Sequence, residues 1–127
     1  MTRFDDISLI TLNSFTGPLG SLISIEEGSN IDFDPKRIFY VFNVPTGSVR
    51  GGHGHEAASQ LLIAISGKCR INCRYKESSK SFVLSSPSEA LFIPPGIWAE
   101  QVYEEDGTVL MVVSDEKYSQ EDYRLEP

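Results

Sequence analysis

Short runs rich in β-branched and aromatic residues alternate along the chain with clusters of glycine, proline and asparagine. These runs cover residues 7–12, 21–26, 37–44, 60–65, 68–75, 81–84, 90–93, 101–103 and 108–113. Runs of this length, separated by turn-forming residues, predict an all-β sandwich or barrel. No segment keeps a 3.6-residue apolar period until residues 119–122, where one short helix could begin.

The length of 127 residues corresponds to one domain, so we assign residues 1–127 to a single unit. With 40% hydrophobic and 23% charged residues, the composition is that of a folded globule. No apolar run approaches the roughly 20 residues that a membrane-spanning helix needs. Because no signal-like apolar stretch follows the first residues either, we expect a cytoplasmic protein with no membrane partner.

The net charge of -7 is concentrated at one end of the chain. Acidic and basic residues balance over residues 1–99, whereas in residues 100–127 only Lys117 and Arg124 oppose the acidic ones. Nucleic acids and anionic membranes select positively charged surfaces. The sequence therefore argues against both as partners.

Cys69 and Cys73 lie four residues apart in a predicted strand. At about 3.3 Å per residue they would be roughly 13 Å apart, too far for a disulfide. We expect two buried free thiols in a reducing compartment, and no zinc site.

The chain has two histidines, and both fall in the segment Arg50-Gly-Gly-His53-Gly-His55. On a strand, side chains two residues apart point to the same face. The two imidazoles should therefore lie together, which favours a ligand-binding or acid-base role over chance placement.

The spacing around the histidines resembles the first cupin motif. The matching residues are Gly47, His53, His55, Gln60 and Gly67, and in that motif the position of Gln60 carries a glutamate. The second motif keeps Pro94-Pro95-Gly96 but has Ala99 where its histidine belongs.

Two imidazoles and a neutral amide form a weak site for a divalent metal, since an open catalytic site normally has three good protein ligands. We therefore expect no bound metal and no cofactor. An alternative remains in which a carboxylate such as Glu100 completes a metal site.

A closer resemblance covers nearly the whole chain and points to the sugar-nucleotide 3,4-ketoisomerases, metal-independent cupins of dTDP-sugar biosynthesis. The matching segments are 20–26, 36–42, 50–55 with Gln60, 67–70, and 113–115 with Tyr118 and 122–123. The resemblance implies a jelly-roll homodimer that moves the keto group of a dTDP-4-keto-6-deoxyhexose from C4 to C3. The product would feed aminotransferases that make O-antigen (lipopolysaccharide) or S-layer sugars.

The resemblance also assigns roles to the histidines. His53 matches the base that removes the C3 proton, and His55 matches a second imidazole that shuttles the proton or orients the substrate. A ketone at C4 acidifies the hydrogen on C3, so a neutral imidazole can form an enediol that is reprotonated at C4.

Six further residues are expected to contact substrate by the same resemblance. They are Arg37, Phe39, Arg50, Gln60, Trp98 and Glu100. The two arginines could hold the pyrophosphate or stabilise enediolate charge. Trp98 and Glu100 match a Trp-x-Glu sequence at the mouth of the barrel.

Four positions depart from the family pattern. Leu19 replaces an arginine, Phe39 a tyrosine, Ala99 the histidine of the second cupin motif and Val102 another histidine. The scaffold therefore matches better than the pocket, so either the substrate differs or acid-base catalysis depends on His53 and His55 alone.

Three functions remain open from the sequence. The first is the ketoisomerase; the second is a related cupin sugar isomerase or epimerase, which could use a metal; the third is a sugar-nucleotide-binding cupin without catalysis. The configuration of the product at C4 and the nucleobase are not fixed by the sequence.

Overall fold

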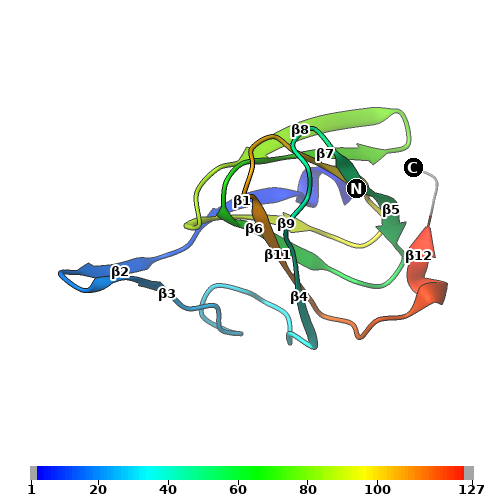
Figure 1. The fold of residues 1–127 in the computed structure, drawn as a ribbon. Coiled ribbons are helices and arrows are strands. Elements are labelled where there is room, and N and C mark those ends of the chain that lie inside the picture. The colour runs from blue at the N-terminus through cyan, green and yellow to red at the C-terminus, as the bar shows by residue number, and fades with distance from the viewer. Residues whose placement is uncertain (1–2, 125–127) are drawn as a thin grey trace.

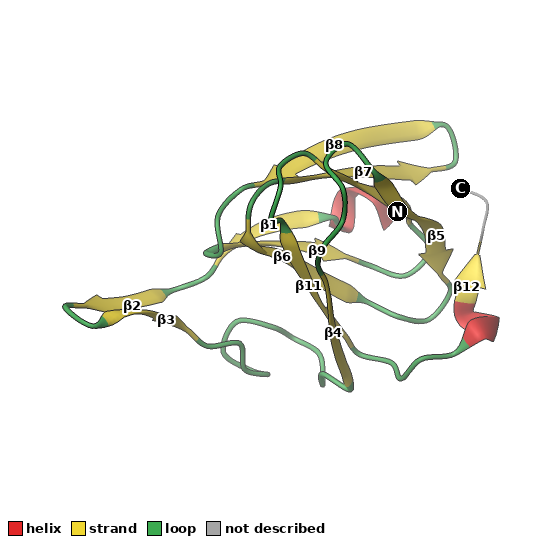
Figure 2. Cartoon of the chain, in the orientation of Figure 1, coloured by secondary structure: helices red, strands yellow, loops and turns green. Residues whose placement is uncertain are grey.

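Strands make up most of the computed structural model, which describes residues 3–124 (Figure 2). They are β1 (Ser8–Thr11), β2 (Ser14–Gly17), β3 (Gly20–Ile23), β4 (Arg37–Val41), β5 (Val49–His55), β6 (Gln60–Ser66), β7 (Cys69–Tyr75), β8 (Ser78–Leu84), β9 (Glu89–Ile93), β10 (Trp98–Tyr103), β11 (Val109–Ser114) and β12 (Tyr123–Arg124). The helical segments are the short 3₁₀ helices η1 (Arg3–Asp6) and η2 (Gln120–Asp122). The helix expected at residues 119–122 is thus confirmed as a single 3₁₀ turn.

Two five-stranded antiparallel sheets face each other across the main core (Figure 1). The first has the order β1-β9-β6-β11-β4 and the second the order β12-β5-β10-β7-β8. Sequence neighbours are often separated in the sheets, as in a jelly roll. The expected all-β, cupin-type jelly-roll fold is confirmed.

Strand β7 shows how the sequence builds the core between the sheets. Cys69, Ile71 and Cys73 are fully buried, while the alternate residues Arg70 and Arg74 face solvent. A strand with one buried face requires this alternation, because successive side chains point to opposite sides. Both cysteines are free, as expected, and burial raises the pKa of each thiol to about 12.

Strand β6 is buried on both faces. Leu62 and Ala64 contribute to the core between the sheets, whereas Leu61 and Ile63 join a second cluster with Ile31 on the outer face of the first sheet. The continuous apolar run of β6 follows from this position at the centre of its sheet.

The predicted strand 21–26 ends early, at Ile23. The Asn30 side chain donates a hydrogen bond to the Ser24 carbonyl and accepts one from the Glu26 backbone N–H, so the chain turns there instead of extending. The predicted strand 37–44 ends at Val41, before Asn43, whose φ is 59°.

The hairpin formed by β2 and β3 projects away from both sheets (Figure 1). Phe15, Leu19 and Leu22 on this hairpin are exposed, and Leu19 is fully so. Strand β2 was not predicted, because its sequence Ser-Phe-Thr-Gly carries only one large apolar residue.

Within residues 3–124, no helix is long and apolar enough to cross a membrane.

Candidate active site

Strand β5 presents both imidazoles to the interior at one end of the barrel. The rings of His53 and His55 are 5.1 Å apart between centroids and meet edge to face, which confirms that they share a face of the strand. Gly54 between them passes so close to the residue before β10 that a Cβ would lie 2.9 Å from the Ile97 carbonyl oxygen. A glycine at this position lets β5 approach the chain near Ile97 and bring the imidazoles inward.

Both ring nitrogens of His55 have protein partners. Nδ1 lies 3.1 Å from Oδ2 of Asp122, and Nε2 lies 3.2 Å from the side-chain amide nitrogen of Gln60. His55 as a whole is only 7% exposed. Its orientation is therefore fixed from two sides by groups on η2 and β6.

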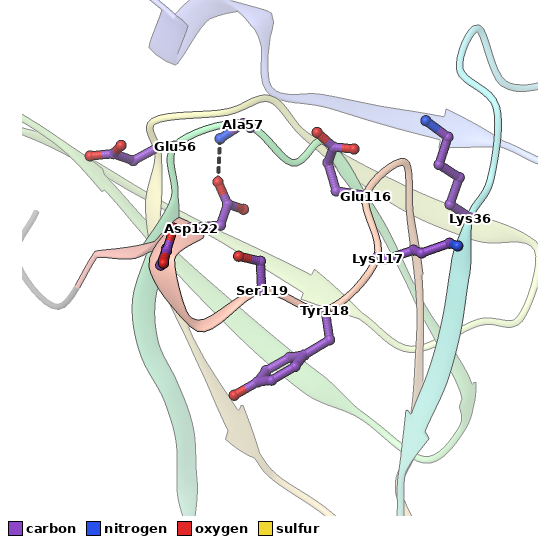
Figure 3. Close-up of a pocket in the computed structure, with 9 residues that line it drawn as sticks. Lys36, Glu56, Ala57, Glu116, Lys117, Tyr118, Ser119 and Asp122 are labelled. Atoms are coloured by element: carbon purple, nitrogen blue, oxygen red, sulfur yellow. Dashed lines mark hydrogen bonds between the residues drawn. The ribbon is translucent and has the colours of Figure 1, made fainter.

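Asp122 is itself held at two points. Its Oδ1 accepts a 2.6 Å hydrogen bond from the Ala57 backbone N–H, drawn in Figure 3, and its carbonyl accepts one from the Glu56 N–H. The next residue, Tyr123, pairs with His55 in the β12–β5 ladder. Residues 122–124, called the C-terminal segment below, are thus attached to β5 by backbone hydrogen bonds as well as by the side-chain carboxylate of Asp122.

His53 has a different environment. Its Nδ1 is buried and has no hydrogen-bond partner among residues 3–124. The ring of Tyr123 lies 4.5 Å from the rings of both histidines, centroid to centroid, and so covers the pair.

Both histidines are shifted toward the neutral form. Burial, with the charge of His55 as a smaller cause, lowers the pKa of His53 below 6.5. Burial also lowers the pKa of His55, although the hydrogen bond and charge of Asp122 oppose the shift; Arg37 adds to it. At neutral pH both imidazoles can therefore accept a proton.

Strand β4 brings a cation to the same end of the barrel. The Arg37 guanidinium lies 4.3 Å from the ring centre of Phe39 and 5.1 Å from that of Tyr118, which is 62% exposed. The Tyr118 and Tyr123 rings are 5.7 Å apart. Aromatic rings therefore connect the arginine to the histidine pair.

Of the sequence-predicted site residues, the structure brings His53, His55, Gln60, Arg37 and Phe39 together. Gln60 contacts His55 and lines the small cavity beside it.

Arg50 lies further along β5, opposite Gln101. Burial raises the pKa of Tyr103 to about 12, and the charge of Arg50 opposes that rise, so the two side chains are near each other. Arg50 is exposed and is separated from His53 by two glycines with positive φ, Gly51 and Gly52.

Trp98 and Glu100 belong to the other face of β10. Ala99, between them, lines the small cavity with the histidines. Trp98 packs against Arg74 with the guanidinium 5.0 Å from its ring centre, and Glu100 accepts a hydrogen bond from Asn72. The structure does not bring Glu100 to the imidazoles, and no cluster of three or more His, Cys, Asp or Glu residues that could hold a metal occurs within residues 3–124.

Two cavities flank the His55–Asp122 pair. The one lined by His53 and His55 measures about 10 Å³, room for about one water molecule. The other, about 670 Å³, lies beside the C-terminal segment and is lined by Lys36, Lys117, Tyr118 and Asp122 among others (Figure 3). A hexose does not fit the inner cavity, so a sugar could reach the imidazoles only from outside it.

Asp122 and Tyr123 were not predicted as site residues. They lie more than 60 positions from the histidines in sequence, and no local spacing connects them. The one available signal was their place in the segments that resemble the ketoisomerases.

A family model described as "FdtA: WxcM-like, C-terminal" matches residues 5–126. A TDP-4-oxo-6-deoxy-alpha-D-glucose-3,4-oxoisomerase from Aneurinibacillus thermoaerophilus is 34% identical over 104 residues, which cover 82% of this chain and 75% of that protein.

Solved structures agree with the sequence matches. QdtA, a sugar 3,4-ketoisomerase from Thermoanaerobacterium thermosaccharolyticum in complex with TDP, superposes with a TM-score of 0.91 at 32% identity, covering 94% of this chain and 88% of QdtA. A mutant of QdtA with a histidine replaced by asparagine was solved with TDP-4-keto-6-deoxyglucose. A 3,4-ketoisomerase from Helicobacter canadensis gives a TM-score of 0.91 at 30% identity, covering 95% of this chain and 91% of that one.

Proposed function

The chain belongs to the FdtA (WxcM-like, C-terminal) family, and from this we propose that it is an isomerase that moves a keto group between C4 and C3 of a TDP-linked 4-keto-6-deoxyhexose. The observation that carries the proposal is a pair of neighbouring imidazoles, half-buried at His53 and buried at His55 and both shifted toward the neutral form, in a chain 34% identical to an oxoisomerase of this substrate class. Such a pair has the acid-base capacity that the reaction requires.

The reaction moves two protons and needs no external oxidant or reductant. A base takes the C3 proton, the electrons of the C3–H bond form a C3–C4 double bond, and the C4 carbonyl oxygen takes up a proton to become the second hydroxyl of an enediol. The later release of the O3 proton balances the proton taken up by O4. Collapse of the enediol makes C3 the carbonyl carbon, forms a C4–H bond and releases the O3 proton, while O4 keeps a proton. C3 is oxidised as C4 is reduced, so the substrate serves as its own redox partner.

We assign His53 as the base that takes the C3 proton. The His53 side chain is half-buried, in contrast to the enclosed His55, and its lowered pKa keeps the ring neutral at pH 7. His55, with both nitrogens bonded, is better suited to orient the substrate or relay a proton.

Arg37 supplies positive charge near the imidazoles, where it could stabilise the enediolate or hold a phosphate. Phe39 lies beneath its guanidinium. Gln60 acts on His55 directly, so its proposed contribution to substrate binding runs through that ring.

Substrate contacts at Arg50, Trp98 and Glu100, which lie further from the imidazoles, are proposed from the resemblance. Arg50 is exposed on the same strand and could reach the pyrophosphate, whereas Trp98 and Glu100 would have to meet substrate on the opposite face of β10. That no metal takes part also stays a prediction, based on Gln60 and Ala99 at two of the four cupin ligand positions.

We further propose that the enzyme is a homodimer in the cytoplasm. The hairpin of β2 and β3 exposes Phe15 and Leu22, and the edge strand β4 exposes Ile38 and Tyr40. Exposed apolar side chains on a projecting hairpin and on an unpaired sheet edge fit docking onto a second copy of the chain. The two free thiols fit a reducing compartment.

Light scattering tests the dimer. We expect twice the chain mass of 14.1 kDa at micromolar concentration, and a shift toward monomer in the Phe15→Asp, Leu22→Asp double variant. A wild-type mass near 14.1 kDa would contradict the proposal.

The function is tested by incubating TDP-4-keto-6-deoxyglucose with the protein and following the C3 and C4 carbon signals by NMR. We expect the keto signal to move from C4 to C3. Binding of the sugar nucleotide with no movement of the keto group would contradict the proposal and leave a binding protein in its place.

A further inference from the structure

Asp122 reaches the histidine pair from the opposite end of the chain. We propose that Asp122 is a positioning residue that holds His55 as the tautomer with its proton on Nδ1, so that Nε2 is unprotonated. The catalytic consequence rests on the proposed ketoisomerase function, but the tautomer itself does not.

The chemistry of the partners sets the direction of the proton. An ionised carboxylate only accepts hydrogen bonds, so at 3.1 Å from Oδ2 of Asp122 the Nδ1 of His55 must be the donor. A neutral imidazole carries one N–H, so Nε2 is then an acceptor. The amide nitrogen of Gln60, 3.2 Å from Nε2, is the donor that this tautomer requires.

The carboxylate is held in place to do this. The Ala57 N–H binds Oδ1, the Glu56 N–H binds the Asp122 carbonyl, and Tyr123 pairs with His55 across the β12–β5 ladder. Both side chains are largely buried, at 12% exposure for Asp122 and 9% for His55. The Asp122–His55 hydrogen bond is therefore shielded from competing water.

The position of Nε2 gives the tautomer a role in the reaction. His55 lines the inner cavity together with His53. If His53 takes the carbon-bound proton, an unprotonated Nε2 on His55 provides a second basic site for the oxygen-bound proton that leaves O3. The Gln60 amide donates to Nε2 in this structure and turns to accept a hydrogen bond when that proton arrives.

Other charged and titratable groups also face His55. They are His53 from β5, Arg37 from β4 and Tyr123 from β12. In contrast to these three groups, Asp122 combines a negative charge with a hydrogen bond to the ring. Both the charge and the hydrogen bond raise the His55 pKa against the effect of burial.

The Asp122→Asn variant separates positioning from simple packing. The Ala57 N–H should continue to bind the amide oxygen, so the new NH₂ group faces Nδ1 of His55 and donates to it. His55 then has to carry its proton on Nε2, and the Gln60 amide turns to accept it. The side chain keeps its shape while the tautomer reverses.

Long-range ¹H–¹⁵N NMR of the histidine rings reads the tautomer without substrate. We expect Nδ1–H at His55 in the wild type and Nε2–H in Asp122→Asn. We also expect kcat to fall at least about tenfold with KM little changed, because binding groups are untouched. Asp115→Asn is the matched control: Asp115 accepts a hydrogen bond from the Ser59 backbone N–H and does not contact the histidines, so neither tautomer nor kcat should change.

Nε2–H at His55 in the wild type would overturn the proposal, whether or not the variant folds. Nδ1–H retained in a folded Asp122→Asn protein, or an unchanged kcat, would also overturn it. If the wild type converts no keto sugar but shows the expected tautomers, the proposed function fails while the role of Asp122 in setting the tautomer stands.

Discussion

His53 and His55 lie two residues apart on β5, yet the regions around them are built differently. His55 is enclosed, with one nitrogen bonded to Asp122 of the C-terminal segment and the other to Gln60 of β6. His53 contacts the Tyr123 ring, and its Nδ1 has no partner within the described residues.

This difference indicates a division of labour. A base that exchanges protons with a substrate needs a nitrogen that the protein does not already use, whereas a group that orients or relays gains from fixed partners. The same strand thus provides one imidazole that is positioned and one that is available.

Replacement of the available imidazole should have the largest effect. His53→Asn removes the proposed base, so turnover should fall by about 10²- to 10⁴-fold, with sugar-nucleotide binding largely retained.

In the wild type, kcat/KM should decline on the acid side below pH 6.5, because His53 must be neutral to act and burial lowers its pKa. Steady-state kinetics against pH checks both; a variant with wild-type turnover would remove His53 from the mechanism.

Replacement of the positioned imidazole should cost less. His55→Asn leaves the base in place, so loss of turnover should be smaller than for His53→Asn, or delivery to C4 should fail while hydrogen exchange at C3 persists. Parallel assays of isomerisation and exchange distinguish these outcomes. If His55→Asn stops exchange and His53→Asn does not, the two roles are reversed.

The backbone between the two imidazoles offers a test through stability. In Gly54→Ala the new Cβ would lie 2.9 Å from the Ile97 carbonyl oxygen, so β5 must shift, and we expect a loss of about 1–3 kcal/mol in the free energy of unfolding. Gly17→Ala is the control, since nothing lies within 4 Å of its Cβ. Denaturant unfolding of both variants measures the difference; equal stability would mean that the close approach at Gly54 is not needed.

The smallest effect is expected at Phe39. Phe39→Tyr adds a hydroxyl next to Arg37, at a position where the sugar-nucleotide 3,4-ketoisomerases carry a tyrosine. Turnover should therefore change, while the free energy of unfolding should change by no more than about 0.5 kcal/mol. Kinetics and thermal unfolding of the variant report the two quantities. A strongly destabilised variant would identify Phe39 as core rather than site.

The sequence predicted the features of the site that depend on local periodicity. A period of two places His53 with His55, which the structure confirms, and the same period applies to Arg37 and Phe39, whose side chains are in contact. These residues need only a strand to be brought together, because each pair shares one element.

Features that depend on long-range pairing were not predictable in the same way. Asp122 meets His55 because β12 pairs with β5. This ladder has two residues on each strand, which is too short for an alternation of apolar and polar residues to predict it. Trp98 and Glu100 were expected near the substrate, but the side of β10 that faces the histidines is fixed by its pairing with β5, which contains an irregularity between Ala99 and Glu100. Likewise, the β2–β3 hairpin has too few apolar residues for its first strand to be recognised.

Hydrogen exchange at C3 tests the central claim most directly. TDP-4-keto-6-deoxyglucose is incubated in deuterated water with wild-type protein and with His53→Asn, and deuterium at C3 and C4 is followed by NMR. If His53 forms the enediol, the wild type incorporates deuterium at C4 of the 3-keto product and at C3 of the 4-keto substrate that re-forms from the enediol. The His53→Asn variant incorporates deuterium at neither carbon, although it still binds the sugar nucleotide. Incorporation by His53→Asn at the wild-type rate would contradict the account, because another group would then be removing the C3 proton.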